Sequence, residues 1–81
     1  MNVWAERQVV LATLGYPSYE AYRHSPRWRL IRGMVLARDN HKCGCGRKAT
    51  QVHHRRYAEA DLLGETLDYM VAICRACHIK G

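Results

Sequence analysis

The stretch YMVAICRACH at residues 69–78 joins an apolar segment to a tight cysteine pair. Its first six residues favour a β-strand, and the residues after Cys74 can begin a helix. Cys74 and Cys77 have the spacing of a zinc knuckle, in which two thiolates from one turn bind the same ion. The Cys-x-x-Cys-His pattern is equally the attachment signature of c-type haem. The rest of the sequence is needed to distinguish the zinc knuckle from the haem site.

A second cysteine pair, Cys43 and Cys45, precedes this stretch. The chain has 81 residues, and a single domain of that size often needs a metal or disulfides in addition to its core. The start MNVWAERQVV has no apolar signal segment, because it carries charge at its sixth residue, so we expect a soluble, cytoplasmic protein. In reducing cytosol, paired cysteines bind metal more often than they form disulfides.

We therefore predict a structural zinc held by the four cysteines, Cys43, Cys45, Cys74 and Cys77. A disulfide and plain buried thiols are the alternatives. The first pair is one residue tighter than the common form, which leaves His41 as a conceivable replacement for Cys43. Haem would require export and would give the first pair no role, so we expect no haem. No run approaches the roughly 18 apolar residues of a membrane helix, so we expect no membrane partner.

The charge of the chain is strongly segregated. The net charge is +6, but residues 21–56 carry ten Lys and Arg against one acid, whereas residues 57–73 carry four acids and no base. An Arg-rich basic segment is typical of proteins that bind a polyanion, because the guanidinium group pairs with phosphate in a fork geometry. The segment favours nucleic acid as the partner, with a solvated charged face as the alternative.

The first half of the chain predicts three helices. Residues 3–13 are good helix formers followed by a Gly and a Pro, and a short helical turn capped by Ser18 comes next. A clearer helix starts with Ser25 as N-cap and Pro26 at the first helical position, and runs to about residue 38. Its apolar residues recur at helical spacing and predict a side that faces the core: Trp28, Ile31 and Val35, with Leu30 and Met34 beside them. The exposed side is basic, with Arg29 opposite the core side and Arg32 on the flank.

The second half predicts a strand over ATQVHH (49–54), a loop with a helical turn, a strand over 69–74 and a terminal helix. If the strands pair, the hairpin carries His53 and His54 to the same end as His78. Two imidazoles for a metal ion and a third as a base are what phosphodiester hydrolysis needs. The alternative is that the adjacent histidines are a polar strand end. Successive strand residues also point to opposite faces, so both histidines can serve one phosphate only where the strand ends or bends.

Three segments together resemble the HNH endonucleases, particularly the small phage and bacterial kind with a four-cysteine zinc. They are SPRWRLIRGMVLARDNHKCGCG (25–46), ATQVHHRRY (49–57) and GETLDYMVAICRACH (64–78). The resemblance covers about residues 25–80 and implies an α+β fold, a ββα-metal finger with N-terminal helices and a four-cysteine zinc knuckle. It implies His54 as general base, His53 and His78 as ligands of a catalytic divalent ion, and the four cysteines as ligands of a structural zinc. Exchange of the roles of His53 and His54 is the alternative. We expect one nuclease domain over residues 1–81, in which residues 1–24 form a helical extension and residues 25–81 the zinc-stapled core.

Two positions depart from the family pattern. Tyr69 stands where the family usually has the Asn or Asp that braces the loop carrying the base. The sequence also ends at Gly81, before the further histidine that some relatives use as a third metal ligand, so water and phosphate are expected to complete the site. A neutral two-imidazole site favours manganese, nickel, cobalt or zinc over magnesium, although cellular availability can reverse that order.

The expected function is a metal-dependent DNA endonuclease, in a bacterium or phage-infected host, acting as a monomer or weak homodimer. Four arginines are expected to hold DNA phosphates: Arg29, Arg32, Arg55 and Arg56. The first alternative is a zinc-stabilised DNA-binding module with a decayed catalytic site, which Tyr69 and the early end of the sequence favour. The second is an interaction domain whose basic segment meets an acidic protein.

Overall fold

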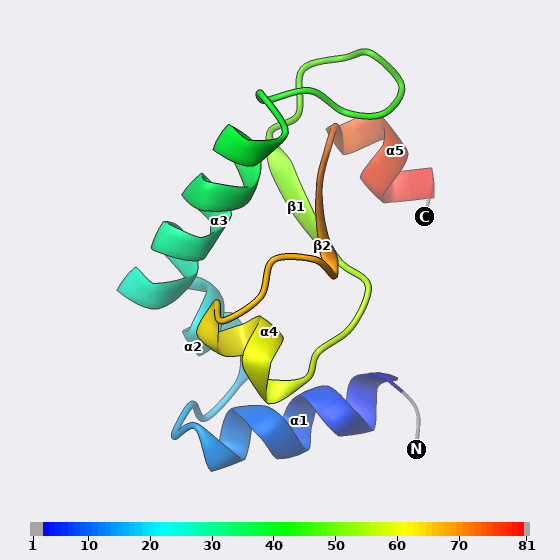
Figure 1. Ribbon diagram of the computed structural model, residues 1–81. Coiled ribbons are helices and arrows are strands. Elements are labelled where there is room, and N and C mark those ends of the chain that lie inside the picture. Colours follow the sequence, from blue (N-terminus) through cyan, green and yellow to red (C-terminus); the bar gives the residue numbers. More distant parts are fainter. Residues whose placement is uncertain (1–2, 81) are drawn as a thin grey trace.

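The computed structural model describes residues 3–80, in which three helices precede a small two-stranded hairpin and two short helices follow its strands. The elements in chain order are α1 (Val3–Thr13), α2 (Tyr19–Arg23), α3 (Pro26–Arg38), β1 (Gln51–His54), α4 (Glu59–Leu63), β2 (Met70–Ile73) and α5 (Arg75–Lys80). In Figure 1, α3 and α5 flank the hairpin of β1 and β2, while α1 lies below α4 and α2. The predicted helices and strands are confirmed, with ends that differ by at most a few residues.

Local side-chain chemistry starts the helices where the sequence predicts. The Ser18 hydroxyl accepts a hydrogen bond from the backbone N–H of Ala21 at 3.0 Å, which caps α2. The Ser25 hydroxyl accepts one from the N–H of Trp28 at 3.2 Å, and Pro26 occupies the first turn of α3. Both caps lie between helices that pack against each other, so they fix the angles at which the chain turns.

The two strands pair antiparallel, with His54 opposite Met70 and His53 opposite Val71. Paired residues share a face, and neighbours along a strand point to opposite faces. His54 therefore lies on the face of Met70, which is buried, while His53 lies on the other face. The α3 helix contacts both strands, and α5 contacts β1.

The core forms between α3 and one face of the hairpin, with Trp28, Ile31 and Val35 all buried. The expectation that Leu30 and Met34 flank this core side is wrong, because they are 66% and 38% exposed. A two-stranded hairpin is narrow, and it covers one stripe of α3 rather than the wider apolar surface. Among the described residues, no helix has the length and apolar character needed to cross a membrane.

Arg38 and Asp39, at the C-terminal end of α3, form an ion pair whose members both hydrogen-bond to β2. The Arg38 guanidinium donates to both carboxylate oxygens of Asp39 at 2.9 Å, and also to the carbonyl of Met70 at 2.7 Å. The Asp39 carboxylate accepts from the N–H of Ala72 at 2.9 Å. The hydrogen bond from Arg38, followed by that from the Ala72 N–H, lowers the pKa of Asp39, although burial opposes the shift. The clamp holds β2 alongside the helix.

A glycine closes α4 against α3. Gly64 follows the last turn of α4 with φ +77°, in the left-handed region, and its N–H bonds to the carbonyl of Asp61. A Cβ placed on Gly64 would lie 2.8 Å from Cγ1 of Ile31. The close approach of the two helices therefore requires glycine for its conformation and for its size.

Candidate metal centre and histidine pocket

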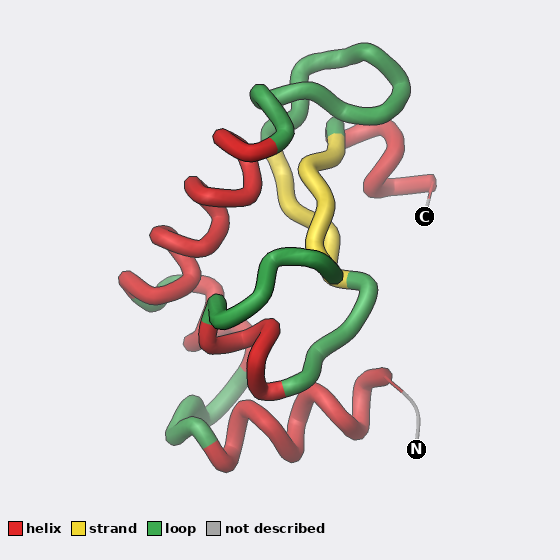
Figure 2. The backbone as a smooth tube through the Cα atoms, viewed as in Figure 1, coloured by secondary structure: helices red, strands yellow, loops and turns green. Residues whose placement is uncertain are grey.

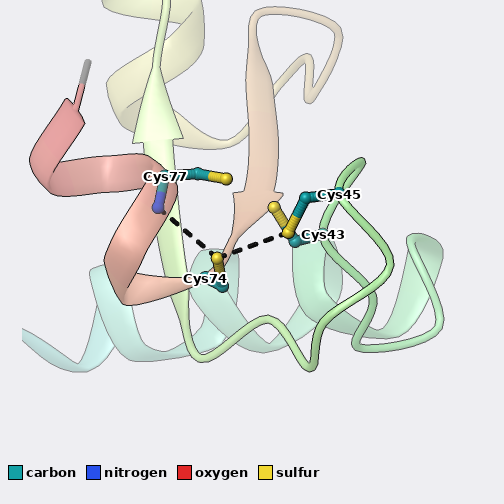
Figure 3. Close-up of side chains that lie close together, drawn as sticks. All are labelled: Cys43, Cys45, Cys74 and Cys77. Atoms are coloured by element: carbon teal, nitrogen blue, oxygen red, sulfur yellow. Dashed lines mark hydrogen bonds between the residues drawn. The ribbon is translucent and has the colours of Figure 1, made fainter.

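Four cysteine side chains converge where the hairpin meets α5 (Figure 3). Cys43 and Cys45 come from the long loop between α3 and β1, which arches over this end of the hairpin in Figure 2, and Cys74 and Cys77 come from the turn into α5. All four sulfur atoms lie within 4.8 Å of one another, and Cys45 Sγ is 3.6 Å from Cys74 Sγ. Four thiolates at the zinc–sulfur distance of about 2.3 Å would be about 3.8 Å apart in a tetrahedron. The cluster has the size and donor set to hold one metal ion.

The residues around the first pair explain why it can be tighter than usual. The N–H of Cys43 bonds to the carbonyl of Arg47, and Gly46 returns the chain with φ +93° and an N–H bonded to the Cys43 carbonyl. His41, the conceivable replacement ligand, is exposed and does not belong to the cluster. Its backbone instead holds the loop, because its N–H bonds to Leu36 and its carbonyl accepts from Ala49.

The pKa values of the cysteine thiols differ within the cluster. Hydrogen bonds from the backbone N–H groups of Cys45 and Cys74 lower the pKa of Cys43 to about 6. The side chains of Cys74, Cys45 and Cys43 raise the pKa of Cys77 to about 12. Hydrogen bonds to the neighbouring cysteine side chains keep the Cys77 thiol protonated, and a cation in the site would favour its ionised form.

His53 and His78 lie close together, but not because the hairpin brings them to the same end as expected. His53 pairs with Val71 near the start of β2, whereas α5 follows the other end of that strand, and the contact of α5 with β1 brings the two rings together. Their ring centroids are 5.7 Å apart, and His78 lies one residue after Cys77 on α5. With a metal–nitrogen distance of about 2.1 Å, a ligating ring has its centroid about 3.2 Å from the ion, so two ligating rings lie at most about 6.4 Å apart. Burial, followed by the charges of His78 and Arg55, lowers the pKa of His53. The two rings are therefore close enough to share one ion.

His54 lies on the opposite face of β1, within an aromatic cluster. Its ring stacks on Tyr57 at 4.8 Å and on Trp28 at 5.0 Å, and only 5% of the residue is exposed. Neither ring nitrogen has a hydrogen-bond partner in the described part of the chain. Burial lowers the pKa of His54 to about 4, so the ring is neutral at pH 7. The alternation of strand residues thus separates His54 from the pair formed by His53 and His78.

All three histidines nevertheless line one pocket of about 470 Å³. Three arginines also line it: Arg7 from α1, Arg23 from α2 and Arg32 from α3. Arg32 also donates a hydrogen bond to the carbonyl of Thr50, just before β1. Of the pocket's cationic residues, the sequence predicted Arg32 but missed Arg7 and Arg23, because no local pattern marks a residue that only packing brings to the site.

The predicted phosphate-binding arginines lie in different surroundings. Arg29 is exposed on the outer side of α3 and borders an apolar groove with Leu30 and Met34, away from the histidine pocket. Arg55 is exposed directly after His54. Arg56 has an internal partner, because its Nε donates to the fully buried carboxylate of Asp61 at 2.8 Å.

Tyr69, directly before β2, joins the same network. The Arg56 guanidinium lies 3.6 Å above the Tyr69 ring, and the Tyr69 carbonyl accepts from the N–H of Arg55 at 2.7 Å. The Asp61 carboxylate also accepts from the N–H of Ala58 at 2.9 Å. The loop that leaves His54 is therefore held at both ends by Arg56, Asp61 and Tyr69.

Comparison of folds identifies a similar solved structure. The crystal structure of the HNH endonuclease of the deep-sea thermophilic bacteriophage GVE2, with manganese ion, matches with a TM-score of 0.66. The match covers 99% of this chain and 89% of that chain, at 22% sequence identity. This chain has the HNH endonuclease fold. No family model and no curated protein sequence matches it. The expected ββα finger with its cysteine knuckle is confirmed as a fold.

Proposed function

We propose that the protein is an HNH-family endonuclease that hydrolyses DNA phosphodiester bonds with a divalent metal ion. The observation that carries the proposal is the pairing of the His53 and His78 rings, 5.7 Å apart, in a pocket that also contains arginines. The HNH fold supports it, since the similar phage enzyme was crystallised with manganese. One such site acts on one strand at a time, so the expected product of a monomer is a nick.

Two metal sites with different tasks follow from the two donor sets. The four cysteines would hold a structural zinc that joins the first loop to α5, because soft thiolates in a tetrahedral set favour zinc. His53 and His78 would hold the catalytic ion, with manganese, nickel or zinc favoured over magnesium by their nitrogen ligands. A divalent ion there supplies positive charge for the scissile phosphate and the leaving oxygen.

His54 is the proposed base. Its ring is neutral at neutral pH, as a proton acceptor must be, and its plane is fixed between Trp28 and Tyr57. A phosphate entering the pocket brings negative charge, which strengthens the base. Tyr69 is proposed to act through Arg56 and Asp61 as a brace for the loop after His54, the task of the usual Asn or Asp.

The enclosed nitrogens of His54 favour one second candidate, a zinc-stabilised DNA-binding module that does not cleave. In both candidates exposed arginines such as Arg29 and Arg55 would contact phosphates and position the DNA without reading its sequence. Either protein would act in the cytoplasm of a bacterium or a phage-infected host, as a monomer or weak homodimer. Cleavage separates the two, because both bind DNA with a steep salt dependence.

The test is relaxation of supercoiled plasmid by zinc-loaded protein with manganese, magnesium, nickel or chelator. His53→Ala is expected to weaken metal binding, and His54→Ala to lower turnover while metal affinity stays constant. The matched control is His24→Ala, because His24 is a largely exposed histidine directly after α2. Metal-dependent nicking that is lost in His54→Ala and kept in His24→Ala supports the nuclease. If no ion supports nicking, the nuclease proposal fails and the DNA-binding module remains.

A further inference from the structure

The helices before residue 25 contribute two arginines to the histidine pocket. Arg7 comes from α1 and Arg23 from α2, and both lie over the ring of Tyr19, with guanidinium carbons 4.0 and 5.9 Å from its centroid. Tyr19 in turn contacts Tyr57 at 5.9 Å and His54 at 6.5 Å between ring centroids. A continuous row of rings therefore connects the two arginines to the proposed base.

The lining of this pocket suits an anion larger than a single phosphate group. It combines three arginines with three histidines, and among the described residues no Asp or Glu lines it. Its volume of about 470 Å³ lies within the range of about 300–1,000 Å³ found for pockets that bind small molecules or parts of larger ligands. A segment of nucleic-acid backbone with more than one phosphate matches this charge and this size.

Stacking on Tyr19 also orients Arg7. A guanidinium that lies over an aromatic ring keeps its N–H groups in its own plane, where they can fork onto phosphate oxygens. Tyr19 is itself held by its edge contact with Tyr57 and by stacking on the fully buried Tyr22 at 6.1 Å. Arg7 therefore lies directly on a ring that is itself held by its neighbours, while the exposed Arg23 approaches the same ring from a larger distance.

We propose that Arg7 and Arg23 bind a second backbone phosphate of the DNA strand, next to the phosphate held at His53 and His78. This inference rests on the proposed function, since it names a further part of the same substrate. It makes α1 and α2 part of the substrate site. Two phosphates held at fixed points would align the scissile bond with His54, so the loss of one raises the barrier to cleavage as well as weakening binding.

The experiment compares Arg7→Met and Arg23→Met with the control Arg27→Met in the full zinc-loaded chain. The control removes the same charge from the surface of α3, where the Arg27 guanidinium lies 3.5 Å from the Tyr16 hydroxyl and outside the pocket. The measurements are plasmid nicking with manganese and binding of a labelled 12-base-pair duplex at several salt concentrations. Zinc content and the urea unfolding midpoint report the fold.

Each pocket variant is expected to lose roughly tenfold to hundredfold in kcat/KM, the effect of one charge-assisted hydrogen-bonded contact. The slope of log K against log salt should fall by about 0.9 for each lost phosphate contact. Duplexes with a single neutral methylphosphonate should locate the contact. A methylphosphonate at one position beside the cut should slow cleavage by the unsubstituted protein and leave the cleavage rate of Arg7→Met unchanged.

The outcomes separate this inference from the proposed function. Nicking by all variants at the rate of Arg27→Met would overturn the phosphate site and leave the nuclease standing. A protein that never cuts, but whose salt slope falls in Arg7→Met and Arg23→Met only, would keep the phosphate site and remove the nuclease. If Arg7→Met unfolds, Arg23→Met tests the inference instead, because Arg23 is exposed. Arg7→Lys then tests Arg7 itself, since it keeps the charge and is expected to retain the salt slope of the unsubstituted protein.

Discussion

Replacement of Gly64 by alanine tests how closely α4 approaches α3. Two costs add at this position. A residue with a Cβ at φ +77° is destabilised by about 1–2 kcal/mol in the left-handed region. Its Cβ would also lie 2.8 Å from Cγ1 and 3.1 Å from Cδ1 of Ile31, and overpacking of this kind costs about 1–3 kcal/mol.

Alanine also restricts the unfolded chain, which offsets about 0.4–1 kcal/mol of this loss. The expected decrease in the free energy of unfolding is therefore about 2–4 kcal/mol. A domain of this length has about 4–12 kcal/mol in total, so the variant should be visibly less stable. Urea unfolding of the zinc-loaded protein, followed by circular dichroism, measures the difference.

Gly15→Ala is the matched control. Gly15 has φ +89°, but no atom lies within 4 Å of an added Cβ, so only the conformational cost applies. We expect this control to lose about 1 kcal/mol. Equal destabilisation of the two variants would refute the reasoning, because it would mean that Ile31 moves away from residue 64 at no cost.

Three further predictions concern the metal cluster and the buried polar groups. Cys74→Ser should lose zinc and the fold together, because structural zinc supplies about 10–16 kcal/mol in zinc-finger peptides; a folded, zinc-free variant measured by metal analysis and circular dichroism would contradict this. Tyr22→Phe should lose about 1–2 kcal/mol in urea unfolding, since the buried Leu62 carbonyl loses its donor at 2.8 Å, and an unchanged midpoint would count against that bond. Asp61→Ala should lose about 3 kcal/mol and speed amide exchange at Ala58, whose N–H then has no acceptor; an unchanged exchange rate there would argue against the brace.

The helices and strands were predictable because their signals are local. Ser18 and Ser25 cap the helices that follow them, and the apolar run after Tyr69 forms a strand. The four-cysteine cluster was predictable from spacing alone, because two tight pairs deliver four ligands whatever lies between them.

What the sequence did not reveal depends on contacts between distant elements. Leu30 and Met34 have the right spacing for a core stripe but lack a partner surface wide enough to cover them. Arg7 reaches the histidine pocket only because α1 packs beside α2, which no motif announces. The separation of His53 from His54 follows from strand alternation, and the register with β2 fixes which of the two lies on the core face.

The clamp at the end of α3 also protects the protein from self-association. In a two-stranded sheet both strands have an open edge, and open edges recruit strands from other chains. On the outer edge of β2 the N–H of Ala72 is bonded to Asp39 and the carbonyl of Met70 to Arg38. These two backbone groups are therefore not free to pair with an incoming strand, because the side chains of Arg38 and Asp39 already bind them. The same ion pair that holds the hairpin in place thereby closes an edge at which β-aggregation would begin.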